Sequence, residues 1–206
     1  MDGTLVDTEP YWIDVEFALA EEFGATWSQD LALQLVGNDL LSSGRFIQEH
    51  MGLPLTPAEI VERLLDGVVA RVETEVPWRP GARELLADLV AAEVPCALVT
   101  MSYERFAAPI VAALPAGTFR VVVTGDQVTH GKPHPEPYLV GAERLGVDAA
   151  DCLAIEESDT GCRSAEAAGC LVLAVPNHVP VGPGPRRIFR RSLVGLTHDA
   201  LPAAVG

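Results

Sequence analysis

The sequence predicts an α/β fold, in which helices cover a parallel sheet and a second block of helices is inserted near the start. From about residue 82 onward, stretches of helical periodicity alternate with short apolar runs, which is the order of a parallel sheet with crossover helices. Those runs are almost continuously apolar, as strands buried on both faces are. Residues 11–78 show helical spacing without a strand pattern, and this indicates the insertion.

The first half of the inserted block is expected to hold two helices. Apolar residues recur at helical spacing over residues 11–23, and Gly24 provides a stop signal. Ser28 is a good N-cap residue for a second helix, and Gly37 would close that helix.

Two more helices are expected in the second half of the block. Ser42 or Ser43 precedes a helical pattern that ends at Gly52. Thr56-Pro57-Ala58-Glu59 combines a cap residue, a proline at the first helical position and a glutamate three residues after the cap. This start signal predicts a helix that runs through Val68.

The rest of the chain alternates between the two kinds of element. Helices are expected over about 82–92, 103–114, 137–145 and 161–168, and buried strands over about 95–100, 119–124, 152–155 and 171–175. The tail from Pro176 is rich in Pro and Gly, so we expect a solvated loop with a last short helix near residues 192–196. The basic cluster Arg186-Arg187 and Arg190-Arg191 is assigned to that loop rather than to a binding patch.

Composition and charge exclude several classes of protein. The 206 residues are 49% hydrophobic and 21% charged, which is typical of a globular chain. The formal net charge of −15 argues against nucleic acid or an anionic membrane as a partner. No apolar run is long enough to span a bilayer, and the N-terminus lacks the basic segment of a secretory signal. The four cysteines form no C-x-x-C pair, so we expect free thiols in a cytoplasmic protein.

Polar side chains follow the ends of the expected strands. Thr100-Met101-Ser102 ends one strand, Gly131-Lys132-Pro133 comes a loop after the next, and Glu156-Glu157-Ser158 ends a third. Because ligands of an open parallel sheet bind beyond the carboxyl ends of its strands, we expect these segments and Asp2-Gly3-Thr4 to meet at one edge. They bring together a hydroxyl, a cation and several carboxylates.

This set of side chains suits phosphoryl transfer. The anionic oxygens of a phosphoryl group are stabilised by a hydroxyl or backbone amides, a lysine and a divalent cation. Mg²⁺ prefers oxygen ligands and keeps waters in its other positions, so two adjacent acids after a strand suit a magnesium site.

The order of these segments resembles the four motifs of the haloacid dehalogenase (HAD) superfamily of phosphatases and phosphomutases. Asp2-Gly3-Thr4 resembles the end of its first motif, Asp-x-Asp-Gly-Thr, and Val99-Thr100 resembles the hydroxyl motif, with Met101 where Asn is frequent. Gly131-Lys132-Pro133 resembles the lysine motif. Glu156-Glu157-Ser158 resembles the acidic motif, with Glu157 where Asp is usual.

The resemblance implies a division of the chain into two parts. Residues 1–10 and 79–206 would form a Rossmann-like core, and residues 11–78 would form an α-helical cap. The helical block occupies the position at which the β-phosphoglucomutase-like and phosphoglycolate-phosphatase-like branch of the family has its cap domain. Pro80-Gly81 marks the return of the chain to the core.

The resemblance also implies roles for individual residues. Asp2 would be the general acid/base, and its backbone carbonyl a magnesium ligand. Thr100 and Lys132 would hold the phosphoryl group, with Met101 beside them. Glu157, helped by Glu156, would ligate Mg²⁺. A carboxylate at position 2 favours phosphate chemistry over dehalogenation. Hydrolysis of a phosphate ester needs a proton for the alcohol leaving group, whereas breaking a carbon–halogen bond needs none.

Only the second half of the first motif stands in this sequence. The family places the nucleophilic Asp two residues before the acid/base, after an apolar strand at the centre of the sheet. Met1 is therefore expected to be an internal methionine, the spacer between the two Asp residues. Upstream coding sequence that ends an apolar run in Asp supports this expectation, whereas a stop codon there contradicts it. Loss of a central strand should cost more than the roughly 5–15 kcal/mol that keeps a domain folded.

The expected function is that of a Mg²⁺-dependent phosphatase of a small phosphorylated metabolite, acting as a monomer. In the full-length form it would act through an aspartyl-phosphate, whereas the chain as written is expected to lose activity by orders of magnitude. The alternatives are a phosphosugar mutase of the β-phosphoglucomutase type and a non-catalytic HAD-like protein or inactive fragment.

Overall fold

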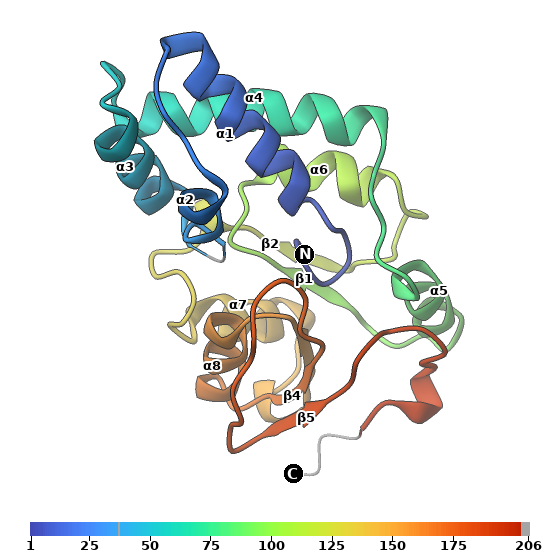
Figure 1. Ribbon diagram of the computed structural model, residues 1–206. Coiled ribbons are helices and arrows are strands. Elements are labelled where there is room, and N and C mark those ends of the chain that lie inside the picture. The colour runs from blue at the N-terminus through green and yellow to red at the C-terminus, as the bar shows by residue number, and fades with distance from the viewer. Residues whose placement is uncertain (37, 203–206) are drawn as a thin grey trace.

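The computed structural model describes residues 1–36 and 38–202 of the chain. In Figure 1 a layer of helices lies above the strands. The upper helices from the first part of the chain are α1 (Glu9–Phe23), α2 (Gln29–Leu33), α3 (Leu40–Met51) and α4 (Pro57–Thr74).

These four helices confirm the helical block that the sequence predicts. The Ser28 hydroxyl caps α2, and Thr56 and Glu59 form the reciprocal capping box of α4. The start of α3 was predicted too late, because Asp39 and not Ser42 or Ser43 is its N-cap residue: Asp39 accepts a hydrogen bond from the backbone N–H of Ser42. Gly37, the predicted end of the second helix, lies outside the described residues.

The strands are parallel, as predicted, and those described form two separate sheets. One sheet pairs β1 (Ala97–Val99) with β2 (Val121–Val123), and the other has the order β3 (Leu153–Glu156), β4 (Leu171–Ala174), β5 (Arg187–Phe189). β1 and β3 belong to different sheets and are not paired with each other. This agrees with the gap predicted between the strands that end near Thr100 and Ile155.

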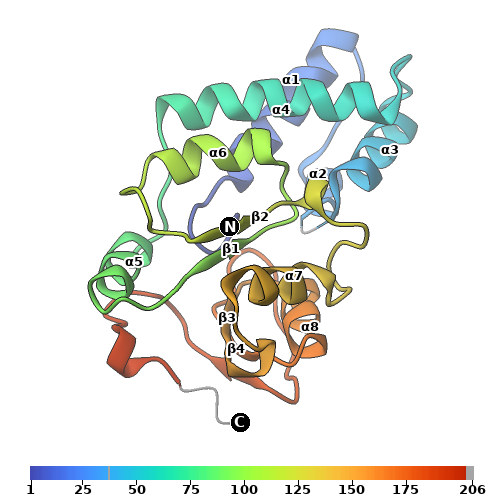
Figure 2. The same cartoon turned by 180° about the vertical axis from the view of Figure 1, so that it is seen from behind.

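Crossover helices connect the strands. They are α6 (Glu104–Ala112), α7 (Glu136–Leu145) and α8 (Asp159–Ala167), whereas α5 (Ala82–Ala91) leads from the first block of helices into β1. All four helices lie close to their predicted ranges. Figure 2 shows α6 on one side of β1 and β2 and α7 on the other, and α8 packs on β3 and β4. This placement brings the loops after β1 and β3 and the first residues of the chain to one side of the sheets.

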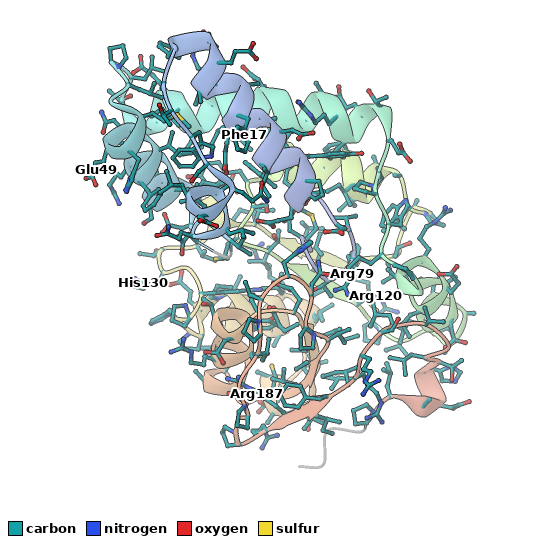
Figure 3. All side chains as sticks on the ribbon, in the orientation of Figure 1. Phe17, Glu49, Arg79, Arg120, His130 and Arg187 are labelled. Atoms are coloured by element: carbon teal, nitrogen blue, oxygen red, sulfur yellow. The ribbon has the colours of Figure 1, made fainter. Side chains whose placement is uncertain are left out.

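The tail differs from its prediction. Residues 187–189 form β5 instead of a loop, residues 192–196 form no helix, and a short 3₁₀ turn at His198–Ala200 was not foreseen. Arg187 is not solvated either, since its side chain is 3% exposed. Its guanidinium contacts Glu166 at 2.8 Å and Asp159 at 2.6 Å, and both acids belong to α8 (Figure 3).

The helical layer and the sheets share an apolar core. Leu19 and Ile60 from the upper helices belong to the same buried cluster as Phe106 of α6 and Leu173 of β4. The Trp12 ring meets the Phe106 ring edge-on, with centroids 5.3 Å apart. Within the part of the chain that the structure describes, no helix has the length and apolar character needed to cross a membrane.

The chain enters and leaves the helical layer at adjacent points. The backbone N–H of Asp7 donates to the Pro77 carbonyl at 2.8 Å, and that of Arg79 donates to the Leu5 carbonyl at 2.8 Å. Two connections that run side by side are what an inserted unit requires. They support the proposed division into a cap over residues 11–78 and a core made of the rest.

Candidate active site

The first loop packs tightly against the loop after β3. The Met1 carbonyl accepts a hydrogen bond from Leu5 N–H at 2.8 Å, and Gly3 N–H donates to the Val6 carbonyl at 2.7 Å. Gly3 has φ of +69°, and a Cβ atom at this residue would lie 2.6 Å from Cγ of Glu157. Both the left-handed backbone and the close approach therefore require glycine after Asp2.

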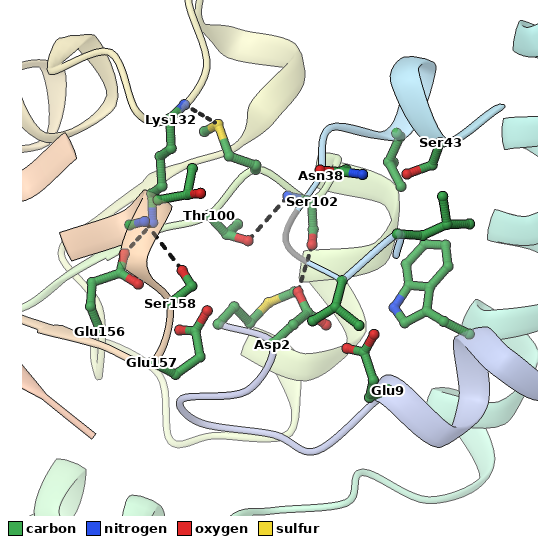
Figure 4. A pocket seen from close by; sticks show the side chains of 18 of the residues that line it. Asp2, Glu9, Asn38, Ser43, Thr100, Ser102, Lys132, Glu156, Glu157 and Ser158 are labelled. Atoms are coloured by element: carbon green, nitrogen blue, oxygen red, sulfur yellow. Dashed lines mark hydrogen bonds and ion pairs between the residues drawn. The ribbon is translucent and has the colours of Figure 1, made fainter. Parts of the chain in front are cut away.

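Two hydroxyl groups orient the Asp2 carboxylate. The Thr8 hydroxyl donates to Oδ1, and the Ser102 hydroxyl donates to Oδ2 at 2.6 Å. Figure 4 shows Asp2 between Ser102, from the loop after β1, and the acids that follow β3. Asp2 is thus held at the edge of the sheets where the sequence places it.

Lys132 bridges the ends of the two sheets. Its ammonium donates to the Val99 carbonyl at 3.1 Å and to Oε1 of Glu156 at 2.5 Å, and the Tyr138 hydroxyl donates to the same carboxylate oxygen. The Lys132 and Glu156 side chains are only 10% and 4% exposed. Burial opposes ionisation of Glu156, but the lysine ammonium outweighs it and the pKa of Glu156 lies below its usual range.

The neighbouring Glu157 has a different environment. Its Oε2 accepts a hydrogen bond from the Thr4 hydroxyl at 2.5 Å. Burial raises the pKa of Glu157, and the negative charge of Glu156 raises it further. A cation bound beside Glu157 would relieve both effects.

The hydroxyl segment lies beside these groups. Thr100 is buried, and its Oγ1 accepts a hydrogen bond from Ser102 N–H at 3.1 Å. The Met101 sulfur accepts one from Lys132 N–H at 3.2 Å. All six residues predicted for the site line one cavity of about 140 Å³: Asp2, Thr100, Met101, Lys132, Glu156 and Glu157.

The far side of this cavity comes from the helical layer, and none of its residues is among the six predicted for the site. Glu9, Trp12 and Glu16 of α1 line the cavity together with Asn38 and with Ser43 of α3. Figure 4 shows Glu9, Asn38 and Ser43 across the opening from Lys132, Glu156 and Glu157. A usable signal was present, since Glu16 lies four residues after Trp12 and three before Leu19, which places it on the apolar face of the predicted helix.

These observations define an α/β protein whose strand ends gather the groups for phosphoryl transfer, beneath a helical layer. Residues 1–175 match the family model of haloacid dehalogenase-like hydrolases. The chain belongs to this family of hydrolase enzymes.

Three relatives show where the chain stands in the family. It is 33% identical over 179 residues to a phosphorylated carbohydrates phosphatase of Thermotoga maritima, covering 82% of this chain and 79% of that one. CbbY from Rhodobacter sphaeroides, solved in complex with phosphate, is 25% identical with a TM-score of 0.87, over 98% and 96% of the two chains. A putative β-phosphoglucomutase from Thermotoga maritima is 29% identical with a TM-score of 0.71, over 88% and 85%.

Proposed function

We propose that the protein is a Mg²⁺-dependent phosphatase of a small phosphorylated metabolite. The observation that carries the proposal is the charge balance of the cavity. Five carboxylate side chains line it, Asp2, Glu9, Glu16, Glu156 and Glu157, against one cationic side chain, Lys132. Lys132 is already paired with Glu156, and the positive charge of the Met1 α-amino group acts on Glu156 and Glu157. The acids still outnumber these two cations, so a phosphate dianion needs a further cation to enter this cavity.

The side chains present fit magnesium. Among residues 1–36 and 38–202, no three His, Cys, Asp or Glu side chains form a metal cluster on their own. Mg²⁺ does not need one, because it binds through one or two carboxylates and takes water and phosphate oxygens in its other positions. The backbone carbonyl of Asp2 and the carboxylate of Glu157 would hold it, and we assign Glu156 mainly to fixing Lys132. The ion would supply neutralisation of the phosphoryl oxygens.

The chain's own residues have distinct roles in this proposal. Lys132 and Thr100 bind the phosphoryl group, with Met101 supporting the lysine loop. Asp2 donates a proton to the leaving alcohol and later takes one from water. The family's nucleophile position precedes Met1, so Asp2 is not assigned the covalent step; the aspartyl-phosphate belongs to a chain that carries an Asp at that position.

The surroundings of the site support a small substrate. The cavity of about 140 Å³ is far below the roughly 300–1,000 Å³ of pockets that hold drug-sized ligands. We also propose a monomer in the cytoplasm. The four cysteines are all free thiols, which supports a reducing compartment.

A phosphatase panel tests this function. Small sugar, polyol and carboxylic-acid phosphates are incubated with and without Mg²⁺, and inorganic phosphate is measured. The panel is run on this chain and on a version extended by an apolar strand that ends in Asp before Met1. Mg²⁺-dependent release by the extended version is expected, with release by the present chain lower by orders of magnitude. No release by either version from any ester contradicts the proposal.

A second candidate function is that of a phosphosugar mutase, because the chain is similar to a putative β-phosphoglucomutase. The same panel separates the two functions. Release of inorganic phosphate without a sugar bisphosphate activator supports the phosphatase. Isomerisation of a sugar phosphate that depends on such an activator supports the mutase.

A further inference from the structure

Helix α1 buries a carboxylate on its apolar face. Glu16 is 4% exposed and lies in the helix beside the buried residues Val15, Leu19 and Ala20. Its Oε2 accepts a hydrogen bond from the Trp27 indole N–H at 3.0 Å. Burial of an acid without a cationic partner is unfavourable, so an apolar residue would suit this position better for stability alone.

Glu16 is also part of the cavity wall. Its second carboxylate oxygen accepts no hydrogen bond from any residue that the structure describes. The indole N–H of Trp27, which does not line the cavity, holds one oxygen of the carboxylate, so the group is already oriented before a ligand enters. Burial raises the pKa of Glu16 to about 7, so above neutral pH a ligand that reaches this wall meets an ionised carboxylate, which only a hydrogen-bond donor can satisfy.

The rest of this side of the cavity is uncharged or acidic. Glu9 adds a second carboxylate, Ser43 a hydroxyl and Trp12 an aromatic face. Among the lining residues that the structure describes, Lys132 alone has a cationic side chain. Lys132 lies on the opposite side of the cavity, where it pairs with Glu156. A second phosphate or a carboxylate on the ligand would face Glu9 and Glu16 without a counter-ion.

We infer that the cavity selects phosphate monoesters of uncharged polyols, with Glu16 accepting a hydrogen bond from a substrate hydroxyl. The inference rests on the proposed function, because it places the phosphoryl group at Lys132 and Thr100. Trp12 suits the C–H surface of a polyol, and Ser43 can donate to or accept from its hydroxyls. Glu16 is thus a residue for specificity, and it takes no part in the chemical step.

A matched pair of esters tests the inference. Sorbitol 6-phosphate and 6-phosphogluconate have the same length and phosphate position and differ in a terminal alcohol against a carboxylate. At pH 8, where Glu9 and Glu16 are ionised, the extended version with Mg²⁺ should turn over the polyol ester with a kcat/KM at least about tenfold higher, since close approach of like charges is strongly disfavoured. Equal or faster turnover of 6-phosphogluconate would overturn the inference.

Two variants locate the effect. Glu16→Gln keeps an acceptor for Trp27 and removes the charge, so it should narrow the ratio of the two kcat/KM values, mainly through a lower KM for 6-phosphogluconate. Glu21→Gln, an exposed residue of the same helix, makes the same change of charge away from the cavity and should leave the ratio unchanged. A ratio that Glu16→Gln leaves unaltered, or that both variants alter equally, contradicts the assignment of Glu16.

A binding measurement keeps this inference separate from the proposed function. Calorimetric titration of the extended version, with its added Asp changed to Asn to prevent turnover, reports the selectivity of binding between the two esters in Mg²⁺. Tighter binding of sorbitol 6-phosphate supports the inference even if no ester is hydrolysed, a result that would contradict the phosphatase alone. Binding of 6-phosphogluconate as tight or tighter, or binding of neither ester, rejects the polyol site.

Discussion

At the scale of single residues, the site is organised by buried charges. Lys132 and Glu156 form a pair that water hardly reaches, with Nζ and Oε1 2.5 Å apart. A buried pair of this kind contributes less through its attraction than it costs when one partner is removed. Lys132 thus stabilises the fold by compensating Glu156, in addition to its proposed role in binding the phosphoryl group.

Replacing Lys132 alone should therefore destabilise the protein. Lys132→Met leaves Glu156 buried without its cation, and we expect the free energy of unfolding to fall by about 3–5 kcal/mol. Arg63→Met is the matched control, because it breaks an exposed ion pair with Glu22 and should cost less than about 1 kcal/mol. Urea denaturation at pH 7 measures both variants. Equal losses in the two would show that the Lys132–Glu156 pair is not buried as described.

Glu16 should make stability depend on pH. Burial raises its pKa to about 7 from an ordinary 4.5, so the folded protein holds a proton there that the unfolded chain has released. The stability associated with this proton is complete below pH 4.5 and is lost as the pH rises to 7, by up to about 3 kcal/mol. In Glu16→Gln that loss disappears.

The measurement compares unfolding free energies of the two proteins from pH 4 to pH 8. The advantage of the glutamine variant should grow between pH 4.5 and 7 and then stay constant, whereas the control Glu21→Gln should follow the original protein. A glutamine variant whose advantage shrinks as the pH rises would show that Glu16 is ionised throughout and compensated by a cation.

At the scale of helices and strands, the sequence predicted correctly the features that depend on a few neighbouring residues. The capping box at Thr56 and the glycine stops at Gly24 and Gly52 predicted helix ends because caps depend on a few neighbouring residues. The strand at residues 187–189 was missed because Arg187 is buried only through Glu166 and Asp159, two acids of a helix some twenty residues away. Sequence showed the basic cluster but not its partners.

The same contrast holds for the site. The sequence placed Asp2, Thr100, Met101, Lys132, Glu156 and Glu157 together because strand ends in a parallel sheet meet at one edge, and the structure shows all six lining one cavity. The wall supplied by α1 and α3 depends on how the helical layer packs over that edge, which periodicity does not determine. Glu16 therefore needed the structure.

The junction between the helical layer and the core should depend on Gly81. This residue has φ of +85°, and a Cβ atom would lie 2.4 Å from the Leu193 carbonyl carbon, where the tail crosses the start of α5. Gly24 has φ of +63° with open space around it. Gly24→Ala should lower the free energy of unfolding by about 1–2 kcal/mol, because alanine is strained in the left-handed backbone. Gly81→Ala should lower it by the same amount plus about 1–3 kcal/mol for the clash with the tail. Thermal unfolding measures both, and similar losses would mean that the tail moves aside freely.

At the scale of the whole molecule, acidity and architecture determine how the site works. The net charge of −15 and the carboxylates of the cavity oppose entry of an anion. The helical layer closes one side of the cavity and adds two more acids to it, Glu9 and Glu16. A divalent cation at Asp2 and Glu157 is therefore central to the account, as is the acid/base role of Asp2.

The most direct test measures phosphate release from sorbitol 6-phosphate by the extended version, which carries an apolar strand ending in Asp before Met1. The assay compares this version with its Asp2→Asn variant, each in Mg²⁺ and in EDTA. We expect release only with Mg²⁺, and Asp2→Asn should lower kcat by about 10²–10⁴-fold, the usual contribution of a general acid/base, while the protein remains folded by circular dichroism. Release that persists in EDTA, or that Asp2→Asn leaves unchanged, would contradict the account.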